Sequence, residues 1–139
     1  MNRDIYVLDA CALIAVLSNE EGADKVVSIY ERALLGKAEI VINAVNLLEV
    51  YYDDYRVHGK ASADKMIKDV KALSVNIISE IDESLISEAG RLKASYKISL
   101  ADAIALAQAK VMDARLLTSD HHEMDKIEAS EPINFLWIR

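Results

Sequence analysis

Five short strand-like runs alternate along the chain with longer segments of helical periodicity. The first run, from Ile5 to Leu8, is continuously apolar and bounded by polar residues, which is typical of a strand buried on both faces of a parallel sheet. The other runs cover residues 38–42, 75–81, 115–118 and 133–138. Because strands that alternate with helices build βαβ units, this pattern predicts an α/β fold, a single α/β/α sandwich around a mostly parallel central sheet.

Helical periodicity covers residues 10–17, 23–35, 43–58, 62–73, 82–95, 99–112 and 121–128. The segment 99–112 is apolar nearly all round, so we expect it to lie in the interior against the sheet. With 139 residues, one proline, four glycines and no Pro/Ser/Gly-rich window, the chain is predicted to form one domain over residues 1–139.

The composition favours a cytoplasmic protein. The most apolar stretch, between Lys97 and Lys110, is shorter than the roughly 20 residues that a membrane-spanning helix needs. The first residues lack the charged and long apolar regions of a secretory signal. Cys11, the only cysteine, cannot form an intrachain disulfide and fits a reducing interior, where it would pack as a small hydrophobe.

Asp102 is the only ionisable side chain between Lys97 and Lys110, inside the helix that is expected to be buried. A buried carboxylate without a partner is costly, so it needs a cation or a shifted pKa. A structural role is equally open, because Ser99 and Asp102 have the spacing of a capping box, in which the acid accepts from the backbone N–H of the cap.

Three further acids are candidates for the same site. Asp9 follows the first strand directly and Asp120 follows the strand that ends at Thr118, which suits ligand binding at the carboxyl ends of parallel strands. Both could instead be simple helix caps. Glu49 lies beside the apolar stripe of its helix, although an exposed glutamate on a helix face is the more common case.

The four acids together suggest a metal centre, because carboxylates that converge repel one another unless a divalent cation balances them. Hard oxygen ligands suit Mg²⁺ or Mn²⁺. Such a site can activate a water molecule and stabilise the charge that develops on a phosphodiester, so metal-assisted phosphoryl hydrolysis is the expected chemistry. No zinc-binding spacing, Walker loop or GxGxxG motif accompanies these acids.

In their order and spacing, four motifs resemble the PIN-domain family, specifically the VapC-type ribonuclease toxins of prokaryotic toxin–antitoxin pairs. The similarity extends over nearly the whole chain. The motifs are Val7-Leu8-Asp9-Ala10-Cys11-Ala12-Leu13-Ile14, Asn46-Leu47-Leu48-Glu49-Val50, Ser99-Leu100-Ala101-Asp102-Ala103, and Leu117-Thr118-Ser119-Asp120 followed by His121-His122-Glu123.

This resemblance implies a Rossmann-like fold, a Mg²⁺- or Mn²⁺-dependent endoribonuclease activity, a homodimer and inhibition by a cognate antitoxin. Asp9, Glu49, Asp102 and Asp120 match the family's catalytic, metal-binding acids. Thr118 matches a hydroxyl residue that orders the last acid, and Glu123 matches an accessory acid. Cys11 departs from the Ser or Thr that many members have there, which puts a hydroxyl role at this position in doubt.

The formal net charge of −7 argues against RNA binding by bulk electrostatics. Metal-bound carboxylates would neutralise part of this charge, and local basic runs could contact phosphates. The candidates in these runs are Arg56, Lys60, Arg91, Lys93 and Lys97, although such runs more often form solvated helix faces.

Two rival functions stay open. A receiver-like signalling domain is also a small Mg²⁺-binding α/β protein, but the sequence lacks a convincing acceptor Asp and later Lys. A PIN-like module without activity could serve as an RNA-binding or scaffolding unit. For oligomerisation, Tyr51, Tyr52 and Tyr55 supply more aromatic surface than one helix stripe needs, and core packing explains them nearly as well.

Overall fold

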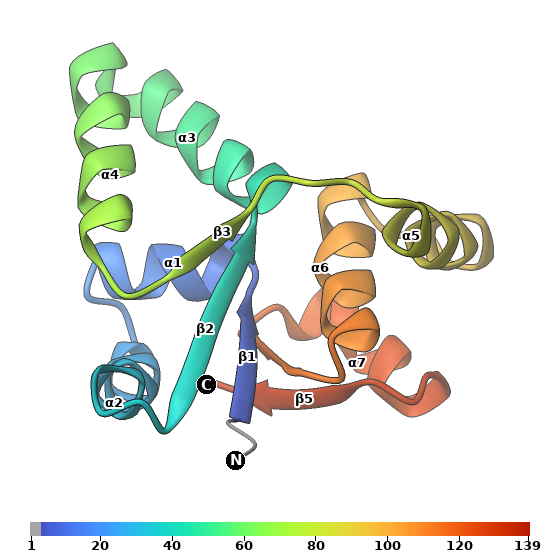
Figure 1. Cartoon of the computed structure of the whole chain (residues 1–139). Coiled ribbons are helices and arrows are strands. Elements are labelled where there is room, and N and C mark those ends of the chain that lie inside the picture. Colours follow the sequence, from blue (N-terminus) through green and yellow to red (C-terminus); the bar gives the residue numbers. More distant parts are fainter. Residues whose placement is uncertain (1–3) are drawn as a thin grey trace.

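The central sheet is parallel throughout, as the alternation of strands and helices predicts. The computed structural model describes residues 4–139. Its strands are β1 (Asp4–Leu8), β2 (Ala38–Asn43), β3 (Asn76–Ile78), β4 (Arg115–Thr118) and β5 (Asn134–Trp137). They lie in the order β3-β2-β1-β4-β5, and every neighbouring pair is parallel (Figure 1).

Helices cover both faces of the sheet and complete the α/β/α sandwich. On one face lie α1 to α4, and on the other lie α5 to α7 (Figure 1). Their bounds are α1 (Ala10–Leu17), α2 (Ala23–Leu34), α3 (Ala44–His58), α4 (Lys60–Ala72), α5 (Glu83–Ser95), α6 (Leu100–Val111) and α7 (His121–Ser130).

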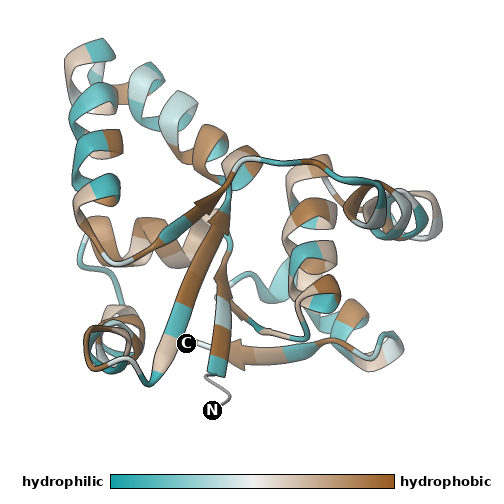
Figure 2. Cartoon of the chain, viewed as in Figure 1, coloured by the Kyte–Doolittle hydropathy of each residue, from teal (hydrophilic) through white to brown (hydrophobic). Residues whose placement is uncertain are grey.

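Each central strand contributes to both cores because successive side chains point to opposite faces. Tyr6 and Leu8 pack with α1 to α4, whereas Val7 packs with α5 to α7. The strands are therefore mostly apolar, with polar residues at or near their ends, as their colouring in Figure 2 shows. Continuous rather than alternating hydrophobicity was the correct signal for strands covered on both sides.

The most apolar helix occupies the interior as predicted. In α6 every residue from Ala103 to Ala109 is buried. Among the helices of residues 4–139, none is both long and apolar enough to cross a bilayer.

Three predicted bounds were wrong by more than one residue at the start or end of an element. The helix predicted over residues 121–128 continues to Ser130, where the Glu131 N–H donates to the Ile127 carbonyl. The other two differ for local reasons. The strand predicted over residues 75–81 is only Asn76–Ile78, because its neighbour β2 ends at Asn43 and offers no pairing beyond Ile78. The helix predicted from residue 62 begins at Lys60, because Gly59 separates α3 from α4 with a φ of 90°. That left-handed φ favours glycine.

Candidate active site

Two of the predicted acids follow neighbouring strands at one edge of the sheet. Asp9 comes directly after β1, and Asp120 comes two residues after the end of β4. Leu8 pairs with Leu117 in the sheet, and the Asp9 N–H donates to the Leu117 carbonyl at 3.3 Å. Parallel strands bring their carboxyl ends to the same edge, so both acids reach one end of the molecule.

Asp9 is a helix cap and also has an oxygen without a partner. Its Oδ1 accepts from the Ala12 N–H at 2.8 Å, while its buried Oδ2 has no hydrogen-bond partner. Burial, followed by the negative charges of Asp102 and Asp120, raises the pKa of Asp9 to about 7, although the Ala12 N–H and the nearby Thr118 hydroxyl oppose the rise. A cap alone does not explain a buried oxygen that nothing satisfies.

Asp102 lies in the first turn of α6, half-buried. Ser99 caps this helix, since its Oγ accepts from the Asp102 N–H at 3.1 Å. The hydroxyl half of the predicted capping box is thus present, but among residues 4–139 no hydrogen bond joins the Asp102 carboxylate to the Ser99 N–H. Burial, and then the charges of Asp120 and Glu123, raise the pKa of Asp102 to about 6.

Glu49 lies in α3, which packs against α6 beside Asp102. The side chain is half-buried rather than exposed, contrary to the common case for a helix-face glutamate. Burial raises its pKa, and the charges of Asp102, Asp53 and Asp120 add to the effect. The electrostatic influence of Asp102 and Asp120 on Glu49 indicates that these acids from three elements share one region.

Asp120 is held by one hydrogen bond from its backbone and one to its side chain. Its N–H donates to the Thr118 Oγ1 at 3.0 Å, and its Oδ1 accepts from the Glu123 N–H at 3.2 Å, which caps α7. The Thr118 side chain is fully buried, so its hydroxyl is fixed beneath the acid. These contacts suit the ordering role that the resemblance implies for Thr118.

The pKa of the Cys11 thiol reflects its burial and the negative charges of the four acids. Burial raises the pKa of Cys11 to about 12, and all four acids, Asp9, Asp120, Asp102 and Glu49, contribute to the rise. One half-buried thiol therefore experiences the four carboxylates together. Among residues 4–139, no Lys or Arg forms an ion pair with any of them.

The donor set fits a hard divalent cation, although the side chains are not drawn together as ligands. In the described part of the chain no three His, Cys, Asp or Glu side chains form a group that could enclose an ion. Carboxylate oxygens are nevertheless the ligands that Mg²⁺ and Mn²⁺ prefer. The unpartnered Asp9 Oδ2 and the raised pKa values of Asp9 and Asp102 are what uncompensated ligands should show.

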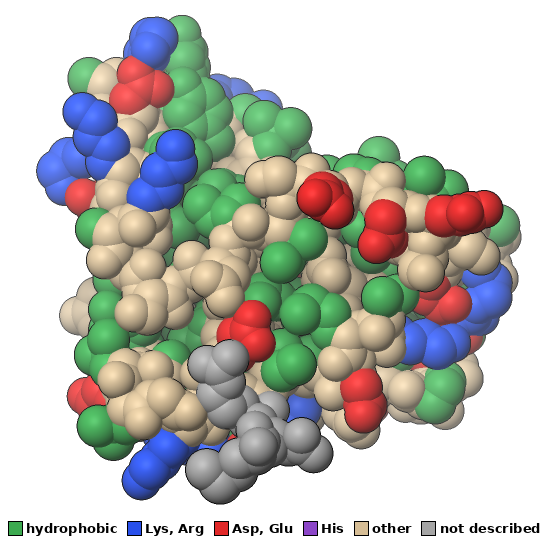
Figure 3. All heavy atoms as spheres, viewed as in Figure 1, with side chains coloured by type: hydrophobic (Ala, Val, Ile, Leu, Met, Phe, Trp, Pro, Cys, Tyr) green, Lys and Arg blue, Asp and Glu red, His purple; other side chains and the backbone are tan. Residues whose placement is uncertain are grey.

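The five predicted RNA-contact residues do not form one patch. Arg56 and Lys60 lie where α3 meets α4 and pair with Asp53 and Asp64, whereas the others lie on or just after α5, on the opposite face of the sheet (Figure 1). Arg91 is held by Glu88 and Glu131. Lys93 and Lys97 are exposed, and no ion pair within residues 4–139 involves them. Figure 3 shows basic side chains gathered over α4 and acidic ones over the side of α5.

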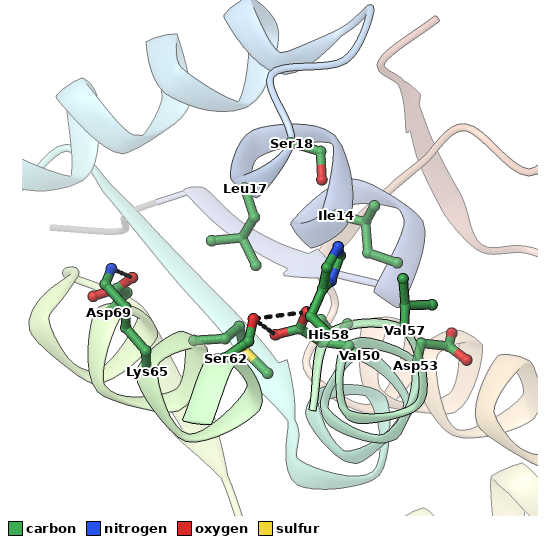
Figure 4. A pocket seen from close by; sticks show the side chains of 12 residues that line it. Ile14, Leu17, Ser18, Val50, Asp53, Val57, His58, Ser62, Lys65 and Asp69 are labelled. Atoms are coloured by element: carbon green, nitrogen blue, oxygen red, sulfur yellow. Dashed lines mark hydrogen bonds and ion pairs between the residues drawn. The ribbon is translucent and has the colours of Figure 1, made fainter. Parts of the chain in front are cut away.

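A cavity of about 430 Å³ lies away from the four acids, between α1, α3 and α4 (Figure 4). Its lining includes the apolar side chains of Ile14, Leu17 and Val57. Within it, Asp54 accepts from Ser62 and contacts the His58 Nδ1 at 2.8 Å. The sequence prediction missed this cavity, because helical spacing shows that α3 and α4 are amphipathic but not that they diverge.

One residue near the acids was also missed. Asn46 is buried one turn before Glu49, and its Nδ2 donates to the Ala101 carbonyl at 2.9 Å. The available signal was a polar residue inside an otherwise apolar stretch of the Glu49 motif.

Comparison with known proteins identifies the family to which this combination of parallel sheet and acidic edge corresponds. The family model of the PIN domain matches residues 6–129, so the chain belongs to the PIN domain family. No curated protein sequence matches significantly.

Solved toxin–antitoxin proteins share the fold. A toxin–antitoxin complex from Klebsiella pneumoniae contains a chain that is 20% identical, with a TM-score of 0.71 and coverage of 96% of this chain and 98% of that one. VapBC2 from Rickettsia felis, bound to promoter DNA, gives 16% identity, a TM-score of 0.72 and the same coverages. VapC20 from Mycobacterium tuberculosis, a toxin that cleaves the sarcin–ricin loop, gives 14% identity, a TM-score of 0.59 and coverage of 80% and 86%.

Proposed function

We propose that this protein is a Mg²⁺- or Mn²⁺-dependent endoribonuclease, the toxin of a toxin–antitoxin pair that acts in the cytoplasm. One observation carries the proposal: Asp9 and Asp120 follow neighbouring strands at one edge of the sheet, Asp9 has a buried Oδ2 without a hydrogen-bond partner, and none of the four acids pairs with a Lys or Arg of residues 4–139. Membership of the PIN domain family supports it, as does the similarity in fold to VapC20, which is described as a toxin that cleaves the sarcin–ricin loop.

The four acids would have different roles in binding the cation. Asp9 and Asp102, the two with the most strongly raised pKa values, would hold the cation, and Glu49 and Asp120 would complete the oxygen ligands. A bound divalent cation supplies an activated water and stabilises charge on the phosphate. Thr118 fixes the Asp120 backbone. Glu123, whose charge acts on Asp102, would be an accessory acid.

Cleavage of a mixed panel of single-stranded RNAs by the purified protein tests this function. We expect cleavage with Mg²⁺ or Mn²⁺, none with EDTA, and none by the Asp102→Asn variant. Asp69→Asn is a matched control, because Asp69 is an acid of α4 that pairs with Lys65 outside the proposed site. Cleavage that persists in Asp102→Asn would place the activity elsewhere or in a contaminant. Folded protein that neither cuts RNA nor gains thermal stability with Mn²⁺ would favour an inactive PIN-like module.

For RNA contacts, Lys93 and Lys97 are the strongest of the five candidates, because carboxylates already engage Arg56, Lys60 and Arg91. Lys97 precedes the helix that carries Asp102. Changing Lys93 and Lys97 to Glu should weaken RNA binding and reduce its dependence on salt. Unchanged binding would show that the phosphate contacts lie elsewhere.

The cognate antitoxin would bind in the cavity between α1, α3 and α4. Leu17 and Val57 line it and are 38% and 72% exposed, which suits the apolar face of an amphipathic helix (Figure 4). Co-expression with a candidate antitoxin tests the assignment. Leu17→Asp should abolish co-purification of the antitoxin. Leu34→Asp, at an exposed leucine outside the cavity, should retain it.

A homodimer would use the exposed face of α3. Leu48, Tyr52 and Tyr55 share this face at helical spacing and are 56%, 48% and 46% exposed. Tyr51 is not part of it, because it packs in the core and its hydroxyl donates to Asp64 at 2.7 Å. Sedimentation should give a dimer for the natural chain and a monomer for Tyr52→Glu. A dimer that survives this change would exclude the α3 face.

A further inference from the structure

Two buried side-chain amides tie α3 to α6. The Asn46 Nδ2 donates to the Ala101 carbonyl at 2.9 Å, and the Asn43 Nδ2 donates to the Gln108 Oε1 at 2.9 Å. Asn46 is 1% exposed and Asn43 is fully buried. Neither tie was expected from the sequence, because both partners lie more than fifty positions away along the chain.

The two ties differ in how close they lie to the acids Glu49 and Asp102. Asn46 is one helical turn before Glu49, and Ala101 is the residue before Asp102, so this tie joins the turn that leads to one acid to the turn that carries the other. The second tie reaches Gln108, almost two turns beyond Asp102. The first tie is therefore the one that can set the separation of the two carboxylates.

The first tie acts against electrostatic repulsion between Glu49 and Asp102. Glu49 and Asp102 are both partly buried, on helices α3 and α6 that pack against each other. Like charges at this edge push α3 away from α6 when no cation balances them. A buried hydrogen bond between the two turns opposes that separation.

The unused half of the Asn46 amide indicates that packing alone did not select this residue. Its Oδ1 is buried and has no hydrogen-bond partner, which is unfavourable for stability. An apolar side chain of similar volume would avoid that cost, as its neighbours Val45 and Leu47 do. What the amide adds is its N–H donor to the Ala101 carbonyl.

We propose that Asn46 is a positioning residue of the acidic site: its hydrogen bond to Ala101 holds Glu49 and Asp102 at the separation that a divalent cation requires. The inference rests on the proposed function. Asn46 itself contacts neither the cation nor RNA; it limits how far the two helices can move before metal binding, so its loss should appear as weaker metal affinity.

Mn²⁺ titration by calorimetry tests the proposal on the natural chain, Asn46→Leu and Gln108→Leu. Both variants remove one buried tie between the same helices, so both should lower the melting temperature in EDTA. Only Asn46→Leu should weaken Mn²⁺ binding, by about 10- to 100-fold, the usual effect of losing a residue that orients metal ligands. Gln108→Leu should stay within about threefold of the natural chain.

Equal loss of Mn²⁺ affinity in both variants would overturn the proposal, because it would reflect general loosening of α3. Unchanged affinity in Asn46→Leu would also overturn it. If Asn46→Leu does not fold, Asn46→Ala, which adds no bulk, gives the same comparison. A natural chain that neither binds Mn²⁺ nor cuts RNA would refute the proposed function as well, which is distinct from failure of the Asn46 variant alone.

Discussion

Two groups of four acids in this molecule have opposite surroundings. On the α3–α4 hairpin, Asp53, Asp54, Asp64 and Asp69 each contact a basic side chain: Arg56, His58, Lys60 and Lys65, respectively. At the carboxyl edge of the sheet, Asp9, Glu49, Asp102 and Asp120 have no Lys or Arg partner within residues 4–139.

The pKa values follow this difference. Hydrogen bonds from Lys60 and Tyr51 lower the pKa of Asp64, whereas burial and like charges raise those of Asp9 and Asp102. Partnered acids on an exposed hairpin are explained by solubility and modest helix stabilisation. Buried acids that lack partners are unfavourable for stability, and the proposed metal site accounts for them.

The largest expected contrast between the two groups is in RNA cleavage. Asp9→Asn should reduce the rate by about 10²- to 10³-fold, because losing a cation ligand removes several kcal/mol of transition-state stabilisation. Asp64→Asn should leave the rate within about twofold, since within residues 4–139 the hydrogen bonds of the Asp64 side chain go to Lys60 and Tyr51. Single-turnover cleavage measures both, and similar losses in the two variants would remove the distinction.

A second contrast concerns Cys11, the only cysteine, which lies two residues after Asp9. With the pKa of Cys11 raised to about 12, its alkylation at pH 8 should be on the order of 10²-fold slower than in the urea-unfolded chain, after allowance for solvent screening. Iodoacetamide labelling followed by mass spectrometry measures this. Asp102→Asn should speed the reaction in the folded protein. If it does not, the acids do not act on the thiol.

A third contrast is the pH dependence of stability without metal. The pKa of Asp9 rises from its ordinary value of 3.8 to about 7 in the folded chain, so folding favours the protonated carboxyl. The contribution of protonated Asp9 to the stability of the folded chain is therefore complete below about pH 4 and is lost as pH rises through 7. The melting temperature in EDTA should therefore fall by several degrees between pH 5 and pH 8. Mn²⁺ or the Asp9→Asn change should flatten the profile, whereas a melting temperature that rises over this range would contradict the assignment.

The smallest effect should come from the hairpin pairs. Lys65 and Asp69 are separated by one helical turn, at 2.8 Å, and their side chains are 75% and 51% exposed. Replacing Lys65 with Gln should leave the urea midpoint nearly unchanged, because solvent and salt screen an exposed pair. Urea denaturation measures this, and a clear fall of the midpoint would show that hairpin ion pairs contribute more than ordinary surface pairs.

The sequence alone determined the order of the elements and the placement of two acids at one edge of the sheet. Apolar runs such as Ile5 to Leu8, with no polar alternation, required a sheet covered on both faces, and the helix of Asp102, apolar nearly all round, required the interior. Asp9 and Asp120 could be placed at one edge because the ends of parallel strands coincide. These features are local or follow from topology, so they can be read from the chain.

Only the tertiary structure decided how the helices approach one another. The third strand is limited to residues 76–78 because β2 ends first, and the five basic candidates lie in separate places. A cavity lies beside α3, and Asn46 is hydrogen-bonded to Ala101. Such contacts join positions far apart along the chain, and no periodicity encodes them. Burial and the sum of neighbouring charges, which raise the pKa of Asp9, arise only when the strands and helices assemble.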